Sequence, residues 1–280
     1  MFLRFLPIRQ RVRYNCKKRF TACANQELIQ ENVKLKDSCQ GKRCFILGNG
    51  PSIKKEDLNL LADEIVFTVN DMYLYEQFNR LNTNYHLLFD PAYFADISKI
   101  IKKVNEAGGN TPTIITSLAG KQQMADNFLP NQFIYLESGF DIAYIDAIGL
   151  NIDYLLPYYC TVIQYALSLA IEMGFTQIYL LGCDCTGIQN FLERKQGELP
   201  TAYCFEMNEE DEKRIKNTTV MSCEHAFYEW HHIFKSYRLL KQIADKRGIG
   251  IVDLTEGGVL DVFPKERLAN ICRSVNDNEK

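Results

Sequence analysis

From residue 43 onward, short apolar runs alternate with longer amphipathic stretches. Apolar runs of this length, bounded by turn residues, are typical of strands buried on both faces, and the stretches between them have helical spacing. The alternation predicts an α/β fold: a Rossmann-like, mainly parallel sheet with helices on both faces. The expected strands are Cys44–Leu47, Ile65–Val69, Tyr85–Phe89, Thr113–Thr116, Phe133–Leu136, Ile178–Leu181 and Gly250–Leu254. The expected helices are Lys54–Leu61, Tyr73–Arg80, Tyr93–Ala107, Val162–Met173 and Tyr228–Arg247.

The turn after the first expected strand is the first candidate for a binding site, because ligands of such sheets lie beyond the carboxyl ends of the strands. It reads Gly48-Asn49-Gly50-Pro51-Ser52. Glycines let the backbone approach a ligand, proline suits a first helical turn, and serine is a good helix cap. A helix beginning there would direct N–H donors at a phosphate. An ordinary β–α turn is the plainer alternative, and the motif alone does not decide between them.

Polar residues also follow the other expected strands. Asn70 comes after the second strand, Asp90 after the third, and Gly182 and Asp184 after Ile178–Leu181. Such side chains bind ribose hydroxyls or base edges, although Asn and Asp also begin turns for structural reasons alone. Taken as a set, they favour a nucleotide site made of Gly48, Asn49, Gly50, Pro51, Ser52, Asn70, Asp90, Thr161, Gly182 and Asp184.

Charge is unevenly distributed along the 280 residues. The net charge is −3, but residues 1–43 carry eleven Lys/Arg against three Asp/Glu, which leaves the remainder at −11. An acidic body argues against nucleic-acid binding, which requires a basic face. No apolar run is long enough to span a membrane. The ten cysteines show no secreted spacing, which predicts reduced thiols and a cytoplasmic protein.

The same patterns divide the chain into segments. Residues 1–42 form a basic arm, 43–273 the nucleotide-binding domain with a lid insertion at about 186–230, and 274–280 a polar tail. Residues 1–20 hold seven Lys/Arg and no acid among several apolar side chains. Such an arm suits the anionic inner face of a membrane, and would make the enzyme peripheral at the inner membrane. A disordered leader or a helix packed on the body is equally compatible, and a homo-oligomer is left open.

Several of these motifs resemble two related families. One is the bacterial lipooligosaccharide sialyltransferases, which use a CMP-activated sugar; the other is the 6-hydroxymethylpterin diphosphokinase MptE-like family, found in surface-polysaccharide gene sets. Both share the first strand with Gly48–Ser52. Val69-Asn70-Asp71-Met72-Tyr73, Phe89-Asp90-Pro91 and the unit from Thr161 to Asp184 resemble sialyltransferase segments. The resemblance covers roughly residues 43–185 and implies the same fold and a nucleotide donor.

Two departures concern activity. A tyrosine that follows the sialyltransferase Ile-Asp-Phe segment falls at Thr186, so a phenol for the leaving phosphate is absent or relocated. The stretch Glu256–Pro264 resembles the diphosphokinase-like family more closely. Fold is therefore transferred more safely than activity.

The resemblance also implies a histidine base. Inverting sugar transfer needs a group that deprotonates the acceptor hydroxyl, and the sialyltransferases use a histidine near the lid. Of the four histidines, His86 lies inside an expected strand and is interpreted as a core or strand-end residue. His231 falls where the sialyltransferase base would fall, and His225 resembles a step of the diphosphokinase-like group. Ordinary helix-start residues are the alternative.

Three functions follow, in order of preference. The first is a metal-independent glycosyltransferase that moves an acidic, sialic-acid-like sugar from a CMP-activated donor to a surface glycan or lipid-linked acceptor. The second is a diphosphokinase that moves pyrophosphate from ATP to a pterin-like alcohol with Mg²⁺ held by carboxylates. The third is a non-catalytic nucleotide-binding protein of a polysaccharide system. No metal site is assigned: the spacing of Cys183, Cys185, Cys223 and His225 does not suit zinc, and no Asp-x-Asp pair is present.

Overall fold

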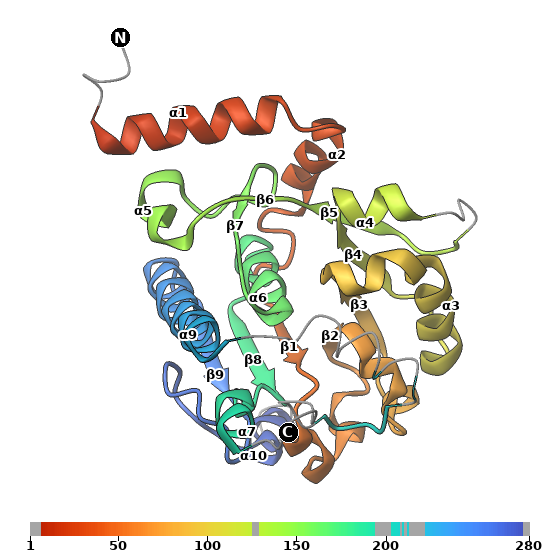
Figure 1. Cartoon of the computed structure of the whole chain (residues 1–280). Coiled ribbons are helices and arrows are strands. Elements are labelled where there is room, and N and C mark those ends of the chain that lie inside the picture. Colours follow the sequence, from red (N-terminus) through yellow and green to blue (C-terminus); the bar gives the residue numbers. More distant parts are fainter. Residues whose placement is uncertain are drawn as a thin grey trace.

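One sheet of seven parallel strands, in the order β5-β4-β3-β2-β1-β8-β9, forms the centre of the computed structural model (Figure 1). The structure describes residues 7–124, 129–193, 203–207, 209, 212 and 222–276. All seven runs expected to be strands are strands, which confirms the Rossmann-like α/β fold. They are β1 (Arg43–Leu47), β2 (Ile65–Val69), β3 (Thr83–Leu88), β4 (Thr113–Ser117), β5 (Phe133–Leu136), β8 (Gln177–Leu181) and β9 (Gly250–Asp253).

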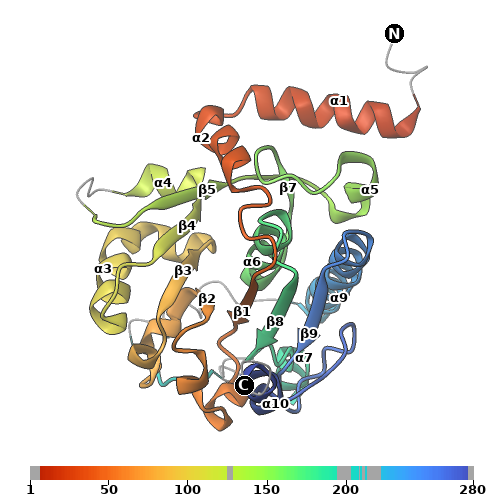
Figure 2. The ribbon, with the colours of Figure 1, turned by 180° about the vertical axis from the view of Figure 1, so that it is seen from behind.

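Helices cover both faces of this sheet (Figures 1 and 2). Alternate strand residues point to opposite faces: Ile46 and Leu180 belong to one buried cluster, Phe45 and Tyr179 to the other. The first cluster includes residues of α6 (Val162–Glu172), α9 (Cys223–Lys246), α1 (Ile8–Thr21) and α2 (Gln26–Gln30); the second includes residues of α3 (Ile97–Gly108) and α10 (Leu268–Asn276). Both faces are therefore buried, which is why most strand residues are apolar.

Two expected helices are wrong in type. Residues 54–61 and 73–80 form short 3₁₀ turns, and Asp57 shows why: its carboxylate accepts the N–H of Asn59 at 3.1 Å and starts a new turn inside the expected helix. A 3₁₀ turn likewise precedes α3. These turns are η3 (Pro51–Lys55), η4 (Leu58–Leu61), η5 (Asn70–Leu74), η6 (Phe78–Arg80) and η7 (Pro91–Asp96).

Other short elements were not expected from the sequence. A second sheet contains only two parallel strands, β6 and β7, each two or three residues long. The remaining elements are η2 (Glu31–Leu35), α4 (Leu118–Gln123), β6 (Ser138–Phe140), η8 (Ile142–Tyr144), α5 (Ile145–Ile148), β7 (Leu156–Pro157) and α7 (Gly187–Glu193). Of the expected lid, residues 194–202, 208, 210–211 and 213–221 lie outside the described residues, and α9 begins before its expected start.

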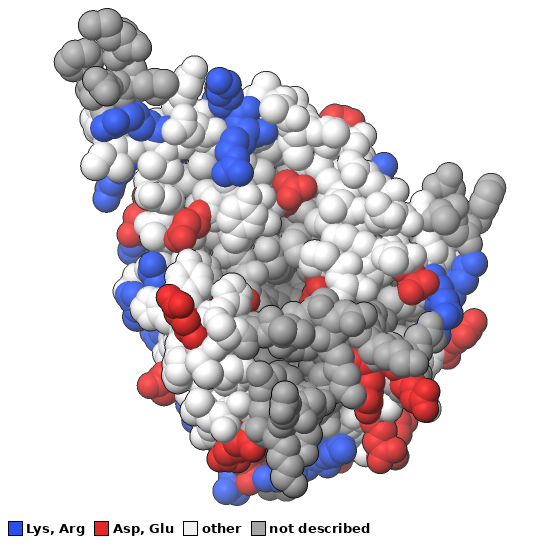
Figure 3. All heavy atoms as spheres, in the orientation of Figure 1, with Lys and Arg blue, Asp and Glu red and all other residues white. Residues whose placement is uncertain are grey.

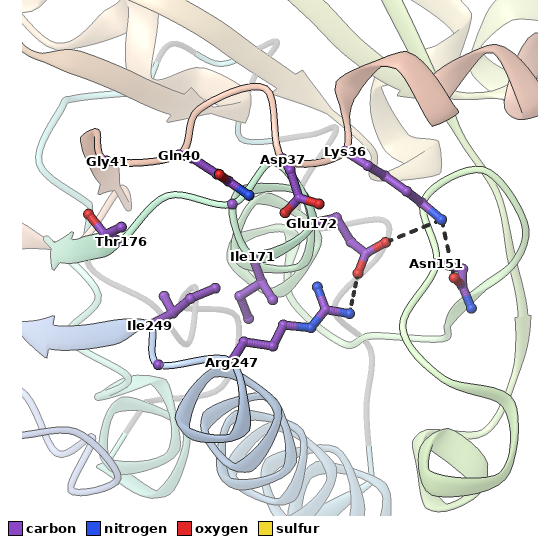
Figure 4. Close-up of a pocket in the computed structure, with 12 residues that line it drawn as sticks. Lys36, Asp37, Gln40, Gly41, Asn151, Ile171, Glu172, Thr176, Arg247 and Ile249 are labelled. Carbon is purple, nitrogen blue, oxygen red and sulfur yellow. Dashed lines mark hydrogen bonds and ion pairs between the residues drawn. The ribbon is translucent and has the colours of Figure 1, made fainter.

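At the amino edge of the sheet, a cavity of about 610 Å³ is crossed by a network of charges (Figure 4). Glu172 is only 4% exposed, and its Oε1 lies 2.6 Å from Nη2 of Arg247. Its Oε2 lies 3.9 Å from Nζ of Lys36, which also contacts Asp153 at 2.5 Å. Burial raises the pKa of Glu172, and the two cations oppose that shift. The network thereby joins the N-terminal segment to the ends of α6 and α9.

Candidate functional site

The strand order reverses between β1 and β8, and the turns that leave these two strands interlock. Gly48 N donates to Leu181 O at 2.8 Å, and Gly50 N donates to Gly182 O at 2.9 Å. A Cβ on Gly48 would lie 2.5 Å from Gly182 O, and one on Gly50 would overlap the carboxylate of Asp184. These glycines are therefore required by close backbone packing at the point where α/β sheets bind their ligands.

Asp184 ties the two turns together. One carboxylate oxygen accepts the N–H of Ser52 at 3.2 Å, and the other accepts its hydroxyl at 2.7 Å. Asp184 is only 9% exposed, and both of its oxygens are occupied by this pair. The expectation that Ser52 caps a helix is therefore wrong. Pro51 begins a 3₁₀ turn of five residues instead of a long helix. Both side chains support the turn from beneath.

A first cavity, of about 170 Å³, lies directly over this interlock. Cys204 N donates to the backbone carbonyl of Asn49 at 2.9 Å, which lays the segment 203–207 against the turn. The side-chain Oδ1 of Asn49 is buried and has no hydrogen-bond partner among the described residues. The walls come from both strand ends and from two helices, and include Gly48, Asn49, Gly50, Pro51, Thr161, Gly182, Asp184, Tyr203, Trp230, Ile233 and Tyr237.

A second cavity, of about 530 Å³, adjoins the first at Thr161, which lines both. Asn70 lines it with a buried Oδ1 that has no partner among the described residues. Asp90 also lines it, but one carboxylate oxygen accepts the N–H of Ala92 at 2.9 Å and caps η7. The ten residues predicted to bind a nucleotide thus lie around two adjoining cavities, with Ser52 beneath the first.

Glu137 and Tyr203 are polar wall residues that the sequence analysis did not select. Glu137 directly follows β5 and lines the second cavity; burial raises the pKa of its carboxyl, and Ser138 N donates to its Oε1 at 3.0 Å. The strand-end rule that selected Asn70 and Asp90 would have selected Glu137 as well. Tyr203 brings a phenol to the first cavity, but it lies in a polar stretch with no periodicity to mark it.

The histidines are not themselves among the residues that line these cavities. His225 is exposed and its Nε2 lies 3.1 Å from Glu229; His231 is also exposed. His232 is buried and bonds Tyr158 O at 3.1 Å. Neither cavity has a histidine among the lining residues that the structure describes, and α9 contributes Trp230, Ile233 and Tyr237 instead. The assignment of the base to His231 or His225 therefore stays a prediction.

No metal centre is found in the part of the chain that the structure describes: no group of three or more His, Cys, Asp or Glu side chains converges there. Cys183 and Cys185 lie at the end of β8, and burial raises the pKa of both thiols. Their partners in the discarded zinc interpretation, Cys223 and His225, belong to the first turn of α9. Both cysteines after β8 line the first cavity.

The sheet, with two adjoining cavities at its switch point, defines a Rossmann-like α/β protein. The family of 6-hydroxymethylpterin diphosphokinase MptE-like proteins matches residues 19–190, and the chain belongs to this family. No curated protein matches the sequence.

Among solved structures, the chain is similar to the sialyltransferase CstII from Campylobacter jejuni. With the complex of cytidine 5′-monophosphate the identity is 19%, the TM-score 0.51, and the match covers 81% of this chain and 85% of that one. With the complex of CMP-3FNeuAc the identity is 19%, the TM-score 0.52, and the coverage 80% and 86%. At this identity the similarity shows a shared fold. Of the two families named by the sequence motifs, the MptE-like family matches the sequence and the sialyltransferases share the fold.

Proposed function

We propose that the protein is a glycosyltransferase that uses a nucleotide-activated sugar. The observation that carries this proposal is the pair of cavities joined at Thr161, each with one buried amide oxygen, on Asn49 and Asn70, that no described residue satisfies. A buried acceptor without a donor is costly unless a ligand supplies the donor. The first cavity would hold part of the nucleotide, and the second the sugar and the acceptor hydroxyl.

The chemistry then requires one proton transfer and one substitution. A base takes the proton of the acceptor hydroxyl, its oxygen bonds to the anomeric carbon, and the bond to the nucleotide phosphate breaks with its electron pair on the phosphate. The predicted base is His231, with His225 second. His231→Gln should abolish transfer while leaving nucleotide affinity unchanged; full activity of this variant and of His225→Gln would remove both from the role.

The proposed donor is a CMP-linked acidic sugar, and no metal cofactor is assigned. The resemblance to sialyltransferases supports it, as do the complexes of the similar structures with CMP and CMP-3FNeuAc. We expect a thermal shift with CMP exceeding that with UDP, GDP or ATP, and slow hydrolysis of the matching donor. A protein stabilised by none of these nucleotides would contradict the proposal.

The second candidate is transfer of pyrophosphate from ATP to a pterin-like alcohol, favoured by the family match. Mg²⁺ would need carboxylate ligands. Asp184 is engaged by Ser52, and the carboxylate of Asp71, 1% exposed, accepts the hydroxyl of Tyr93 at 2.6 Å. Asp90 and Glu137 are the carboxyl groups that line the second cavity. Stabilisation by ATP that disappears with EDTA would favour this function, and binding without any turnover would favour a non-catalytic role.

The basic arm is proposed to bind the anionic face of a membrane, which would keep a cytoplasmic enzyme near a lipid-linked acceptor. Helix α1 has six Lys/Arg and no acid, and only Cys16 and Phe20 among its residues are buried. Figure 3 shows blue side chains gathered over this end of the molecule. None of the described helices is long and apolar enough to cross a bilayer.

Vesicle sedimentation tests the arm. Binding to vesicles with phosphatidylglycerol, and none to pure phosphatidylcholine, is expected, and Arg9→Glu with Arg13→Glu should weaken it. Equal binding by wild type and variant would refute the role of the arm. Gel filtration addresses the open question of a homo-oligomer.

A further inference from the structure

His86 is hydrogen-bonded to Asn70, a residue that lines the second cavity. His86 lies in β3, fully buried beside β2, with the edge of its ring on Phe78 at 6.4 Å between centroids. Its Nδ1 lies 2.7 Å from Oγ1 of Thr68, its register partner on β2. Its Nε2 lies 3.0 Å from the backbone carbonyl of Asn70. The ring thus connects the middle of β2 to the residue that follows it.

The protonation of the ring is determined by these partners. A carbonyl only accepts, so Nε2 carries the proton and donates to Asn70. Nδ1 is then the acceptor and takes the hydroxyl proton of Thr68. Burial lowers the pKa of His86 to about 3, so the ring stays neutral in this tautomer at physiological pH.

The bonded carbonyl belongs to a residue in an unusual conformation. Asn70 has a φ of 48°, in the left-handed region, at the point where β2 ends and η5 begins. Asparagine tolerates this region better than most residues, but it is held there only where surrounding contacts require it. The bond from His86 is such a contact. The same residue lines the second cavity, and its Oδ1 is buried with no partner among the described residues.

We propose that His86 is a positioning residue of the substrate site: with Thr68 it fixes the backbone of Asn70 so that the amide oxygen meets a hydroxyl or amino donor of the bound substrate. This inference rests on the proposed function for the identity of the substrate. The class of bonding group follows from Asn70 itself, since a free carbonyl oxygen can only accept.

Binding of CMP-sialic acid, measured by calorimetry, tests the proposal with a set of variants. His86→Leu removes both hydrogen bonds and should weaken binding about tenfold, the effect of losing one well-placed hydrogen bond. Asn70→Ala should do the same. The double variant should be no weaker than the worse single one, because both changes remove the same contact. His86→Gln retains one donor and one acceptor and should stay within about threefold of wild type.

Two controls separate positioning from stability. Thr68→Ser keeps the hydroxyl and should bind as wild type, whereas Thr68→Val should follow His86→Leu in direction. The ratio of wild-type to His86→Gln affinity should be constant between pH 5 and 8, because the ring does not titrate there in the folded protein. A His86→Leu protein that melts earlier yet binds with wild-type affinity, while Asn70→Ala binds weakly, would overturn the proposal.

Failure of the proposed function gives a different result. Wild-type protein would then bind no CMP-sialic acid at all. The hold of His86 on the backbone of Asn70 is still testable in that case from the backbone chemical shifts of Asn70. We expect shifts typical of a positive φ to be lost in His86→Leu and kept in His86→Gln. Unchanged shifts in His86→Leu would show that His86 does not hold this conformation, independently of any substrate.

Discussion

The two edges of the sheet use polar groups in opposite ways. At the amino edge, the buried carboxylate of Glu172 is matched by Arg247 and Lys36, so the network is complete without a ligand. At the carboxyl edge, Asp184 is matched by Ser52, but the amide oxygens of Asn49 and Asn70 are buried without a described partner. The amino-edge cavity, of about 610 Å³, is larger than either cavity at the carboxyl edge. Its buried carboxylate is nevertheless paired with cations of the protein itself.

The difference teaches that cavity size is a poor guide to function in this fold. A polar network that satisfies itself joins elements, here the N-terminal segment, α6 and α9. A polar group left unsatisfied in a closely packed wall is expensive and is retained where a ligand completes it. The comparison predicts that changes at the amino edge affect stability alone, and that changes to the free amides affect binding alone.

The largest effect is expected where the carboxyl edge is itself structural. Gly50→Ala places a methyl group on the carboxylate of Asp184 and should break its two bonds to Ser52. We expect a loss of about 3 kcal/mol in the free energy of unfolding, with loss of CMP binding, by urea denaturation and calorimetry. Gly109→Ala is the control: the space around Gly109 is open, so the only cost is that of its positive φ, and about 1 kcal/mol is expected. Equal losses would disprove the interlock.

The next effect depends on pH. The folded pKa of His86 is about 3, below its unfolded value of 6.5, so the unfolded chain binds more protons and stability falls as pH falls below 6.5. Between pH 7 and pH 5 His86 should remove about 2 kcal/mol from the free energy of unfolding. His86→Gln lacks this proton, so the difference between the two proteins isolates it. Parallel stability curves would show that the folded ring titrates normally.

At the amino edge a smaller loss of stability is expected. Glu172→Ala leaves Arg247 and Lys36 without their shared carboxylate, but both cations are partly exposed, so about 1.5 kcal/mol should be lost. CMP affinity should be unchanged, because Glu172 lines neither cavity at the carboxyl edge. Glu106→Gln, an exposed carboxylate on α3, serves as the matched control and should change neither quantity. Weakened CMP binding in Glu172→Ala would show that the two edges are coupled.

The smallest change in stability is expected for Asn49→Ala. The variant removes a buried oxygen that bonds to no described residue, so the free energy of unfolding should change by no more than about 0.5 kcal/mol. CMP affinity should fall about tenfold, because the ligand loses its acceptor. A large loss of stability with intact binding would mean that Asn49 is a structural residue, and the contrast between the edges would fail.

The sheet was predictable because its strands are apolar on both faces and end in turn residues. The short turns were harder: Asp57 interrupts an amphipathic stretch through a bond to Asn59 that spacing does not reveal. β6 and β7 are too short for any periodicity, and β7 ends in Pro157.

The site was predictable as a set of positions and not as a set of atoms. The strand-end rule selected Asn49, Asn70 and Asp184, yet only the structure shows that the first two have free oxygens and the third has none. Pairing of Asp184 with Ser52 depends on a contact across 132 residues. The bonds of His86 to Thr68 and Asn70 span only 18 and 16 residues, but its position inside an expected strand does not reveal them.

The interlock of the two turns also sets the order in which the protein can be completed during synthesis. Residues 48–52 leave the ribosome well before residues 182–184, and neither turn has its final partners until both are present. The contact closes a long loop, and such contacts form late. The walls of the first cavity are therefore complete only once β8 has been inserted beside β1.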